Sequence, residues 1–241
     1  TQLPNKYKNS LERIASLLSK NINNLPKAKM LKLCRLGNVI FSSSQGHKYT
    51  QKAYNESSNY PYENVLSAIN YSASLLSKNN FDIAYNVLND TLDTFLGLNF
   101  NTNTTISYEN NFIIAKYYCG RISKKEALRQ FKKIYNIICE VKFSDSIIVQ
   151  NNYAAMNIIN CSQETLAKAE EILKEIILNK DNYHRFFAVH NLLVLSCLSQ
   201  NKEKFLYYKE FFEVPYLLRK YEELFIRKID LLYQNFNKCN T

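Results

Sequence analysis

Glycine is scarce in this chain, with four residues among 241, whereas globular proteins usually contain about 7%. Loops that cradle phosphate groups depend on glycine, and so do the many tight turns of β-rich folds. Neither G-x-G-x-x-G nor G-x-x-x-x-G-K-[ST] occurs in the sequence. The shortage therefore disfavours nucleotide-binding loops and β architectures, and it favours a chain built from helices.

Long apolar runs and paired cysteines are also missing. The most apolar stretch, 186–198, contains His190 and Asn191 and falls short of the ~20 residues of a membrane span. The six cysteines never lie closer than 20 residues, which excludes C-x-x-C and zinc-finger spacings. With no secretory signal pattern either, we expect a cytoplasmic protein with free thiols. Because the chain begins with Thr1 and not Met, we also expect a fragment of a longer protein.

Residues for catalysis or metal binding are few. The chain has three histidines; His190 and Cys197 share a helix face, but no further ligand or orienting acid accompanies them. The pairs at 170–171 and 222–223 are glutamates on predicted helices, and solvated faces are their simplest interpretation. We therefore predict that the protein is not an enzyme and holds no metal or cofactor.

The net charge of +10 is concentrated near the N-terminus. Residues 1–60 carry ten Lys and Arg but two acids, whereas residues 61–241 carry 21 and 19. Lys29, Lys32 and Arg35 recur at three-residue intervals and predict a basic stripe on one helix. Such a stripe suits contacts to nucleic-acid phosphates, but a solvated face or an acidic neighbouring domain is the preferred explanation.

Apolar residues follow a helical period almost throughout. A first helix is expected near 11–18 and a second after Pro26. Gly97 and Gly120 stand where helices should end, and Ser162 with Thr165 marks a helix start. The remaining helices are expected near 61–78, 80–97, 105–119, 122–142, 144–160, 162–179, 182–200, 201–213 and 215–236.

We divide the chain into three regions. Residues 1–60 form a basic N-terminal helical cap that includes a polar loop at 42–59. Residues 61–213 form helical repeats, and residues 214–241 supply a C-terminal capping helix. Polar composition is the reason for the loop assignment, since the stretch from Ser42 to Asn59 has few large apolar residues.

A repeated spacing links the first helix of a pair to the second. Within 71–88 and again within 114–134, a small residue is followed twelve positions later by an alanine, Ala84 or Ala127. Degenerate versions place Ala169 and Phe205 at the same point, so the four anchors are 43, 42 and 36 residues apart. This pattern resembles the tetratricopeptide repeat. The resemblance implies an all-α, right-handed superhelical stack of antiparallel helix pairs, about five in number.

The resemblance also implies a function, the recognition of a protein or peptide in a concave groove. In tetratricopeptide-like proteins the first helix of each pair lines that groove, where side-chain amides can grip a peptide backbone. The residues in that position are Asn110, Asn111, Asn151, Asn152, His190 and Asn191. With 31 asparagines in the chain, chance placement is the competing explanation.

Two families use such regions as sensors: bacterial receptors for signalling peptides, and signal-transduction ATPases, including those of antiphage defence. The resemblance permits either, with the effector domain outside this chain. A nucleic-acid-binding helical repeat that uses the basic stripe is the alternative.

Overall fold

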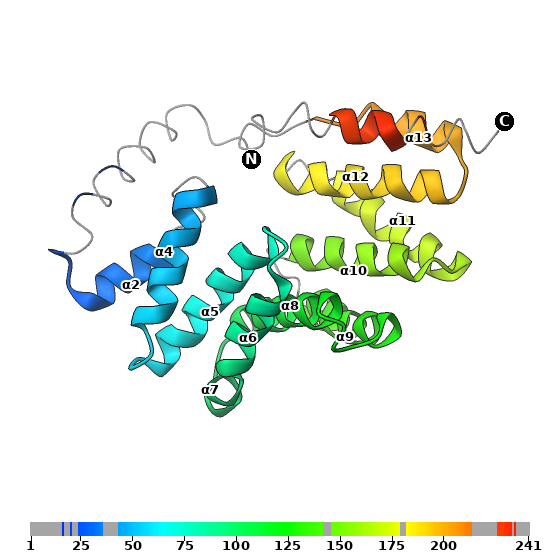
Figure 1. Cartoon of the computed structure of the whole chain (residues 1–241). Coiled ribbons are helices and arrows are strands. Elements are labelled where there is room, and N and C mark those ends of the chain that lie inside the picture. Colours follow the sequence, from blue (N-terminus) through cyan, green and yellow to red (C-terminus); the bar gives the residue numbers. More distant parts are fainter. Residues whose placement is uncertain are drawn as a thin grey trace. The chain divides into compact units, whose positions relative to one another are not determined.

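The computed structural model describes residues 16, 20, 24–35, 43–141, 146–178, 182–213, 226–232 and 234, and every regular element among them is a helix. This confirms the all-α prediction for the described residues. Figure 1 shows the elements, which are α2 (Lys27–Arg35), α4 (Ser43–Glu56), α5 (Pro61–Leu76), α6 (Phe81–Asp90), α7 (Leu92–Gly97), α8 (Thr102–Tyr118), α9 (Lys124–Val141), α10 (Ser146–Asn160), α11 (Gln163–Leu178), α12 (Asn182–Leu198) and α13 (Lys202–Lys209). No helix in these ranges is long and apolar enough to cross a membrane.

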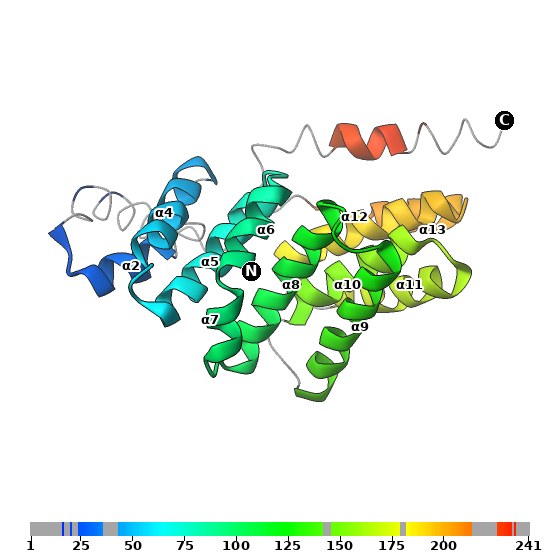
Figure 2. The same cartoon turned by 60° about the horizontal axis from the view of Figure 1, so that its bottom comes forward.

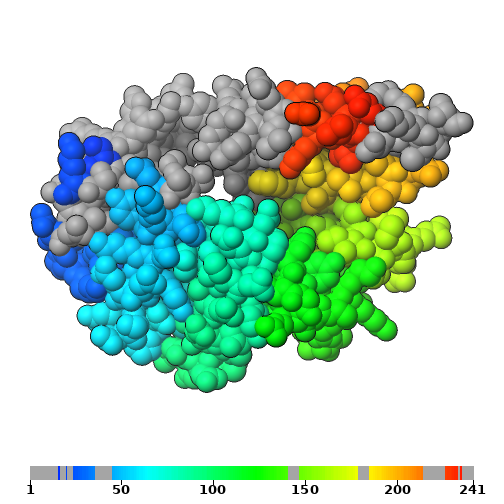
Figure 3. All heavy atoms as spheres, viewed as in Figure 1, coloured from blue at the N-terminus to red at the C-terminus, as the bar shows by residue number. Residues whose placement is uncertain are grey.

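The chain divides between Ser123 and Lys124 into two compact units. In the first unit, α2 packs on α4 and α5, and α5 also contacts α6, α7 and α8. Figure 3 shows the atoms of this unit in colours that run from blue to green along the sequence. In the second unit, α10 packs on α9, α11 and α12, and α12 also contacts α11 and α13 (Figure 2). This division falls inside the predicted 61–213 repeat region, whereas the boundaries proposed near residues 60 and 214 stay predictions.

One expectation is wrong, because the predicted loop at 42–59 is mostly the helix α4. Its buried face is made of small residues, Gly46, Thr50 and Ala53, at helical spacing. On the same helix, Tyr54 stacks on Tyr71 of α5 with 5.7 Å between ring centroids. A face of this kind gives little hydrophobic signal in the sequence, but it lets α4 approach α2 and α5 closely.

Side-chain caps mark the starts of three helices, α8, α11 and α13. The Asn101 side chain accepts a hydrogen bond from Thr104 N at 2.9 Å before α8, and Asn201 does the same for Lys204 N before α13. At α11, Ser162 Oγ accepts from Thr165 N at 3.2 Å, which confirms the predicted start. Each cap satisfies a backbone donor that the first helical turn leaves without a partner.

The turns within the predicted helix pairs share one backbone device. Within the described ranges, the residues with positive φ are Asn79, Gly120, Cys161 and Gln200, at intervals of 41, 41 and 39 residues. After Gly120, Arg121 N donates to Lys116 O at 2.8 Å, and Asn201 N donates to Ser196 O at 2.9 Å in the same way. These are left-handed residues that end one helix shortly before the next begins. Their spacing is direct evidence for a repeat of about 40 residues.

The predicted helix at 80–97 is interrupted at Thr91, which separates α6 from α7. There the hydroxyl of Tyr108, on α8, donates to the backbone carbonyl of Leu88. The ring of Tyr108 also stacks on Phe95 of α7, with 4.0 Å between centroids. The break is therefore compensated by a tertiary hydrogen bond and an aromatic contact.

The repeat anchors lie in the cores of their units. Ala84, Ala127, Ala169 and Phe205 are all fully buried. Small residues at these points let helices approach, which is the role that the spacing predicts. The structure thus supports a helical repeat, whereas the handedness of the stack and the antiparallel pairing stay predictions. The predicted helix at 11–18 lies almost wholly outside the described residues, and only 226–232 and 234 are described from the one at 215–236.

Candidate functional site

An open groove runs across three helices of the second unit and has a volume of ≈ 570 Å³. One wall belongs to α9, the other to α11, and α10 contributes to the lining between them. The lining residues are Lys125, Leu128, Arg129, Lys132, Tyr153, Asn157, Glu164, Thr165, Ala167, Lys168 and Glu171. A concave surface lined by several charged and aromatic side chains is the kind of site that binds a ligand.

The two walls present the same spacing of side chains. On α9 the charged residues stand at 125, 129 and 132, and on α11 they stand at 164, 168 and 171. Each set follows the i, i+4, i+7 pattern of one helix face, and the sets are 39 residues apart. The walls therefore belong to the second helices of two successive predicted pairs, and they carry different charges.

Two of the wall cations are already paired within their own helices. Arg129 donates two hydrogen bonds of 2.7 Å to Glu126, and Lys168 lies 3.0 Å from Glu171. Hydrogen bonds from Arg129 and then Gln130 lower the pKa of the Glu126 carboxyl to about 2. Lys125 and Lys132, both exposed, have no ion pair among the described residues.

The floor of the groove is formed by buried residues of α10. Tyr153 is buried, and Asn157 Nδ2 donates to its backbone carbonyl at 2.8 Å. The Tyr153 ring lies 4.9 Å from that of Tyr135, and Lys168 Nζ lies 5.9 Å from the Tyr135 ring. Burial, followed by a hydrogen bond with Cys139, raises the pKa of the Tyr135 hydroxyl, so this phenol is neutral at pH 7. Tyr153 and Asn157 thus form a floor between the charged walls, and Tyr135 packs against the Tyr153 ring.

The predicted groove residues of the first unit are buried. Asn110 Nδ2 donates to Asn111 Oδ1 at 3.1 Å, and the two side chains are 5% and 8% exposed. Asn111 Nδ2 in turn donates to Ile69 O and Ser72 Oγ on α5, at 3.0 and 3.2 Å. The amide of Asn111 is therefore occupied in joining α8 to α5.

The predicted groove residues of the second unit are half-buried, and two of them are hydrogen-bonded to each other. Asn191 Nδ2, on α12, donates to Asn151 Oδ1, on α10, at 3.1 Å. The neighbouring His190 has its pKa lowered by burial, against a hydrogen bond with Asn191 that raises it. Asn152 lies beside Asn151 and is also half-buried. In both units, then, an asparagine joins the first helix of one predicted pair to that of the next.

The basic stripe is only partly free. Lys29 and Lys32 are exposed, whereas Arg35 is half-buried and its Nη1 lies 2.8 Å from Glu63 on α5. Nearby, Glu56 on α4 pairs with Lys27 and lies 3.7 Å from Lys52. Hydrogen bonding to Lys27 lowers the pKa of Glu56, although partial burial opposes this. Much of the local positive charge therefore serves to join α2 to α4 and α5.

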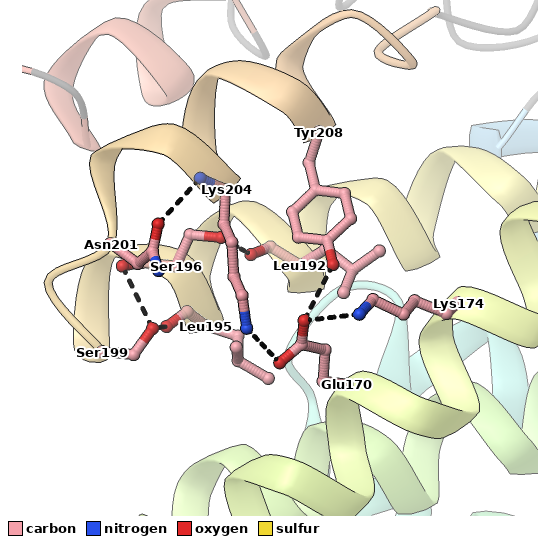
Figure 4. A network of polar contacts seen from close by, with 9 residues as sticks. All are labelled: Glu170, Lys174, Leu192, Leu195, Ser196, Ser199, Asn201, Lys204 and Tyr208. Carbon is pink, nitrogen blue, oxygen red and sulfur yellow. Dashed lines mark hydrogen bonds and ion pairs between the residues drawn. The ribbon is translucent and has the colours of Figure 1, made fainter.

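A polar network around Glu170 was not anticipated (Figure 4). Its carboxylate lies 2.8 Å from Lys174 and 2.7 Å from Lys204, and it accepts a hydrogen bond of 3.0 Å from Tyr208. The interpretation of residues 170–171 as a solvated face is wrong for Glu170, whose side chain is 14% exposed. Burial raises its pKa, but the three hydrogen bonds outweigh burial and lower it to about 2. The network fastens α13 to α11.

In the part of the chain that the structure describes, no cluster of three or more His, Cys, Asp or Glu side chains is arranged to hold a metal ion. Five cysteines in that part are free thiols, among them Cys34, whose pKa burial raises to about 11. The side chain of His184 lies outside the described residues.

Comparisons with protein-family models, with curated proteins and with solved structures return no match for this chain. The resemblance to the tetratricopeptide repeat consequently rests on the sequence spacing and on the repeated left-handed turns.

Proposed function

We propose that this chain is a non-catalytic helical-repeat domain that binds a peptide or a peptide-like segment of a partner protein. The observation that carries the proposal is the groove between α9 and α11, whose two walls come from successive predicted helix pairs and carry different charges. Repeats preserve the backbone and vary exposed side chains, which builds binding surfaces without changing the fold. A larger regulator, such as a peptide receptor or a signal-transduction ATPase, is the setting that we propose for it.

The site proposed here differs from the one that the asparagines suggested. The amide of Asn111 is hydrogen-bonded to Ile69 O inside the first unit. In the second unit, the side chains of Asn191 and Asn151 are hydrogen-bonded to each other. A buried amide that leaves its partner for a ligand loses a hydrogen bond of about 1 kcal/mol and strands the other group. A ligand that contacts Lys125, Lys132 and the Tyr153 floor has no such cost to overcome, because the groove is already open.

The test is a selection of peptides from a random library displayed on phage, with the whole chain as target. Ala167 is exposed in the groove wall, so Ala167→Trp fills the groove, whereas Leu178→Trp alters an exposed position of the same helix outside it. We expect selected peptides to bind the Ala167→Trp variant at least about tenfold more weakly and the Leu178→Trp variant normally. Failure to select any peptide with this sensitivity would show that the groove is not a peptide site.

Nucleic-acid binding through the first unit is the second candidate, and the exposure of Lys29 and Lys32 favours it. Binding of this kind weakens steeply as salt rises, because counterions are released from the phosphates. The test measures a labelled RNA against wild type and Lys29→Glu/Lys32→Glu at several salt concentrations. Arg35 is left unchanged because Glu at this position would face Glu63 and disturb the fold. Equal affinity of both proteins, or an affinity independent of salt, would exclude this candidate.

A further inference from the structure

The charges of the groove walls define the chemistry of an occupant. On α9 the wall carries three cations, Lys125, Arg129 and Lys132. On α11 it carries two carboxylates, Glu164 and Glu171, on either side of Lys168. Since Arg129 is held by Glu126 and Lys168 by Glu171, the cations left for a ligand are those of Lys125 and Lys132. The groove thus offers positive charge from one side and none of comparable strength from the other.

We propose that the occupant is an acidic peptide segment that places carboxylates against Lys125 and Lys132, which deepens the function proposed above and rests on it. These two lysines are seven residues apart on one helix, which corresponds to about 10 Å along the axis. Two carboxylates at that separation pair with both ammonium groups. The apolar parts of the segment lie over Leu128, Ala167 and the Tyr153 floor.

The α11 wall explains why the occupant is a peptide and not a nucleic acid. A nucleic-acid duplex carries phosphates along both of its strands, so a duplex in the groove would bring negative charge against Glu164 and Glu171 as well as against the lysines. A peptide has a different residue at each position. It presents acids to α9 and neutral or basic groups to α11. The opposite charges of the walls therefore also fix which edge of the peptide faces which helix.

The test uses the displayed random library and two charge-reversal variants of the full chain. Lys125→Glu/Lys132→Glu reverses the proposed contacts. Lys124→Glu/Lys133→Glu is the matched control, since these exposed residues are on the same helix, directly beside the first pair, and do not line the groove. Both variants change the net charge equally, so a difference between them reports the groove and not the overall field.

We expect acidic residues to be enriched among peptides whose binding the Ala167→Trp variant reduces. Fluorescence anisotropy with the synthesised peptides should show about tenfold or greater weakening with Lys125→Glu/Lys132→Glu and less than about twofold with the control. Replacing the peptide acids by Lys should restore binding to the reversed variant. Circular dichroism and thermal unfolding of each variant verify that the fold is intact.

Three results would overturn the inference, and they differ in what they leave standing. The first result is that the peptides sensitive to Ala167→Trp are not enriched in acidic residues, or bind both charge variants with equal affinity. This would refute the acidic occupant but not peptide binding by the groove. The second result is that no acidic peptide is selected, but a labelled single-stranded oligonucleotide binds and is weakened by Lys125→Glu/Lys132→Glu. The ligand of the groove would then be a nucleic acid and not a peptide. No ligand sensitive to Ala167→Trp would refute the proposed function itself.

Discussion

At the scale of single residues, asparagines and a glutamate carry much of the polar connection between helices. Asn111 joins α8 to α5, Asn191 joins α12 to α10, and Glu170 joins α11 to α13. Each is at least half-buried, so its hydrogen bonds are sheltered from water, and each would leave unsatisfied partners if it were removed. These residues therefore contribute to stability and are poorly suited to release their partners for a ligand.

Replacing Asn111 by Ala tests this structural role. We expect a loss of about 1–3 kcal/mol in the free energy of unfolding, because Ile69 O and Ser72 Oγ lose a buried donor. Urea unfolding measures the change. The control is Asn86→Ala at an exposed position of α6, which should be neutral or slightly stabilising through helix propensity. Equal effects of the two substitutions would show that the Asn111 bonds do not stabilise the fold.

Glu170 gives a prediction about pH. Its pKa is about 2 in the folded protein, below the ordinary value of 4.5, so its contribution is complete above pH 4.5. That contribution is lost as the pH falls from about 4.5 to about 2. Glu170→Gln should therefore lower stability at pH 7 and flatten its decline over this range, as followed by unfolding at several pH values. Glu171→Gln, on a side chain 60% exposed, should leave the pH profile nearly unchanged.

At the scale of elements, the left-handed turns determine where helices end. Gly120 suits its turn because glycine adopts positive φ freely, whereas Asn79, Cys161 and Gln200 adopt it at some cost. Side-chain caps mark the starts of α8, α11 and α13, and α4 packs through a face of small residues. The repeat of about 40 residues arises from the turns more regularly than from the anchors that the sequence suggested.

Glycine substitutions separate backbone conformation from crowding. An added Cβ would meet no atom within 4 Å at either Gly97 or Gly120, but only Gly120 has a positive φ, of 69°. We expect Gly120→Ala to destabilise the protein by about 1 kcal/mol and Gly97→Ala to be neutral or stabilising. Denaturant midpoints compare the two. A Gly120→Ala protein as stable as wild type would contradict the role of this turn.

At the scale of the whole molecule, the polar connections described above close within one compact unit or the other. The Asn111 bonds lie in the first unit, and the Glu170 network lies in the second. A substitution in one unit should therefore raise amide hydrogen exchange mainly in that unit. Mass spectrometry should show faster exchange in α5 and α8 for Asn111→Ala, and in α11 and α13 for Glu170→Gln. Uniform acceleration over both units would mean that the chain opens as a single cooperative block.

The sequence by itself determined the helical class, most helix positions, the capping at Ser162 and the burial of the alanine anchors. These depend on local periodicity and on backbone chemistry within one turn, which neighbouring residues encode. Only the tertiary structure decided that α4 is a helix, that Tyr108 compensates the break at Thr91, and that Glu170 is enclosed by Lys204 and Tyr208. It also decided that charged residues of α9 and α11, 39 positions apart in the sequence, line the two walls of one groove. The amide of Asn111, in contrast, is buried and hydrogen-bonded to α5. The physical reason is that burial and charge pairing depend on which surfaces meet in space, and spacing along one helix does not encode its neighbours.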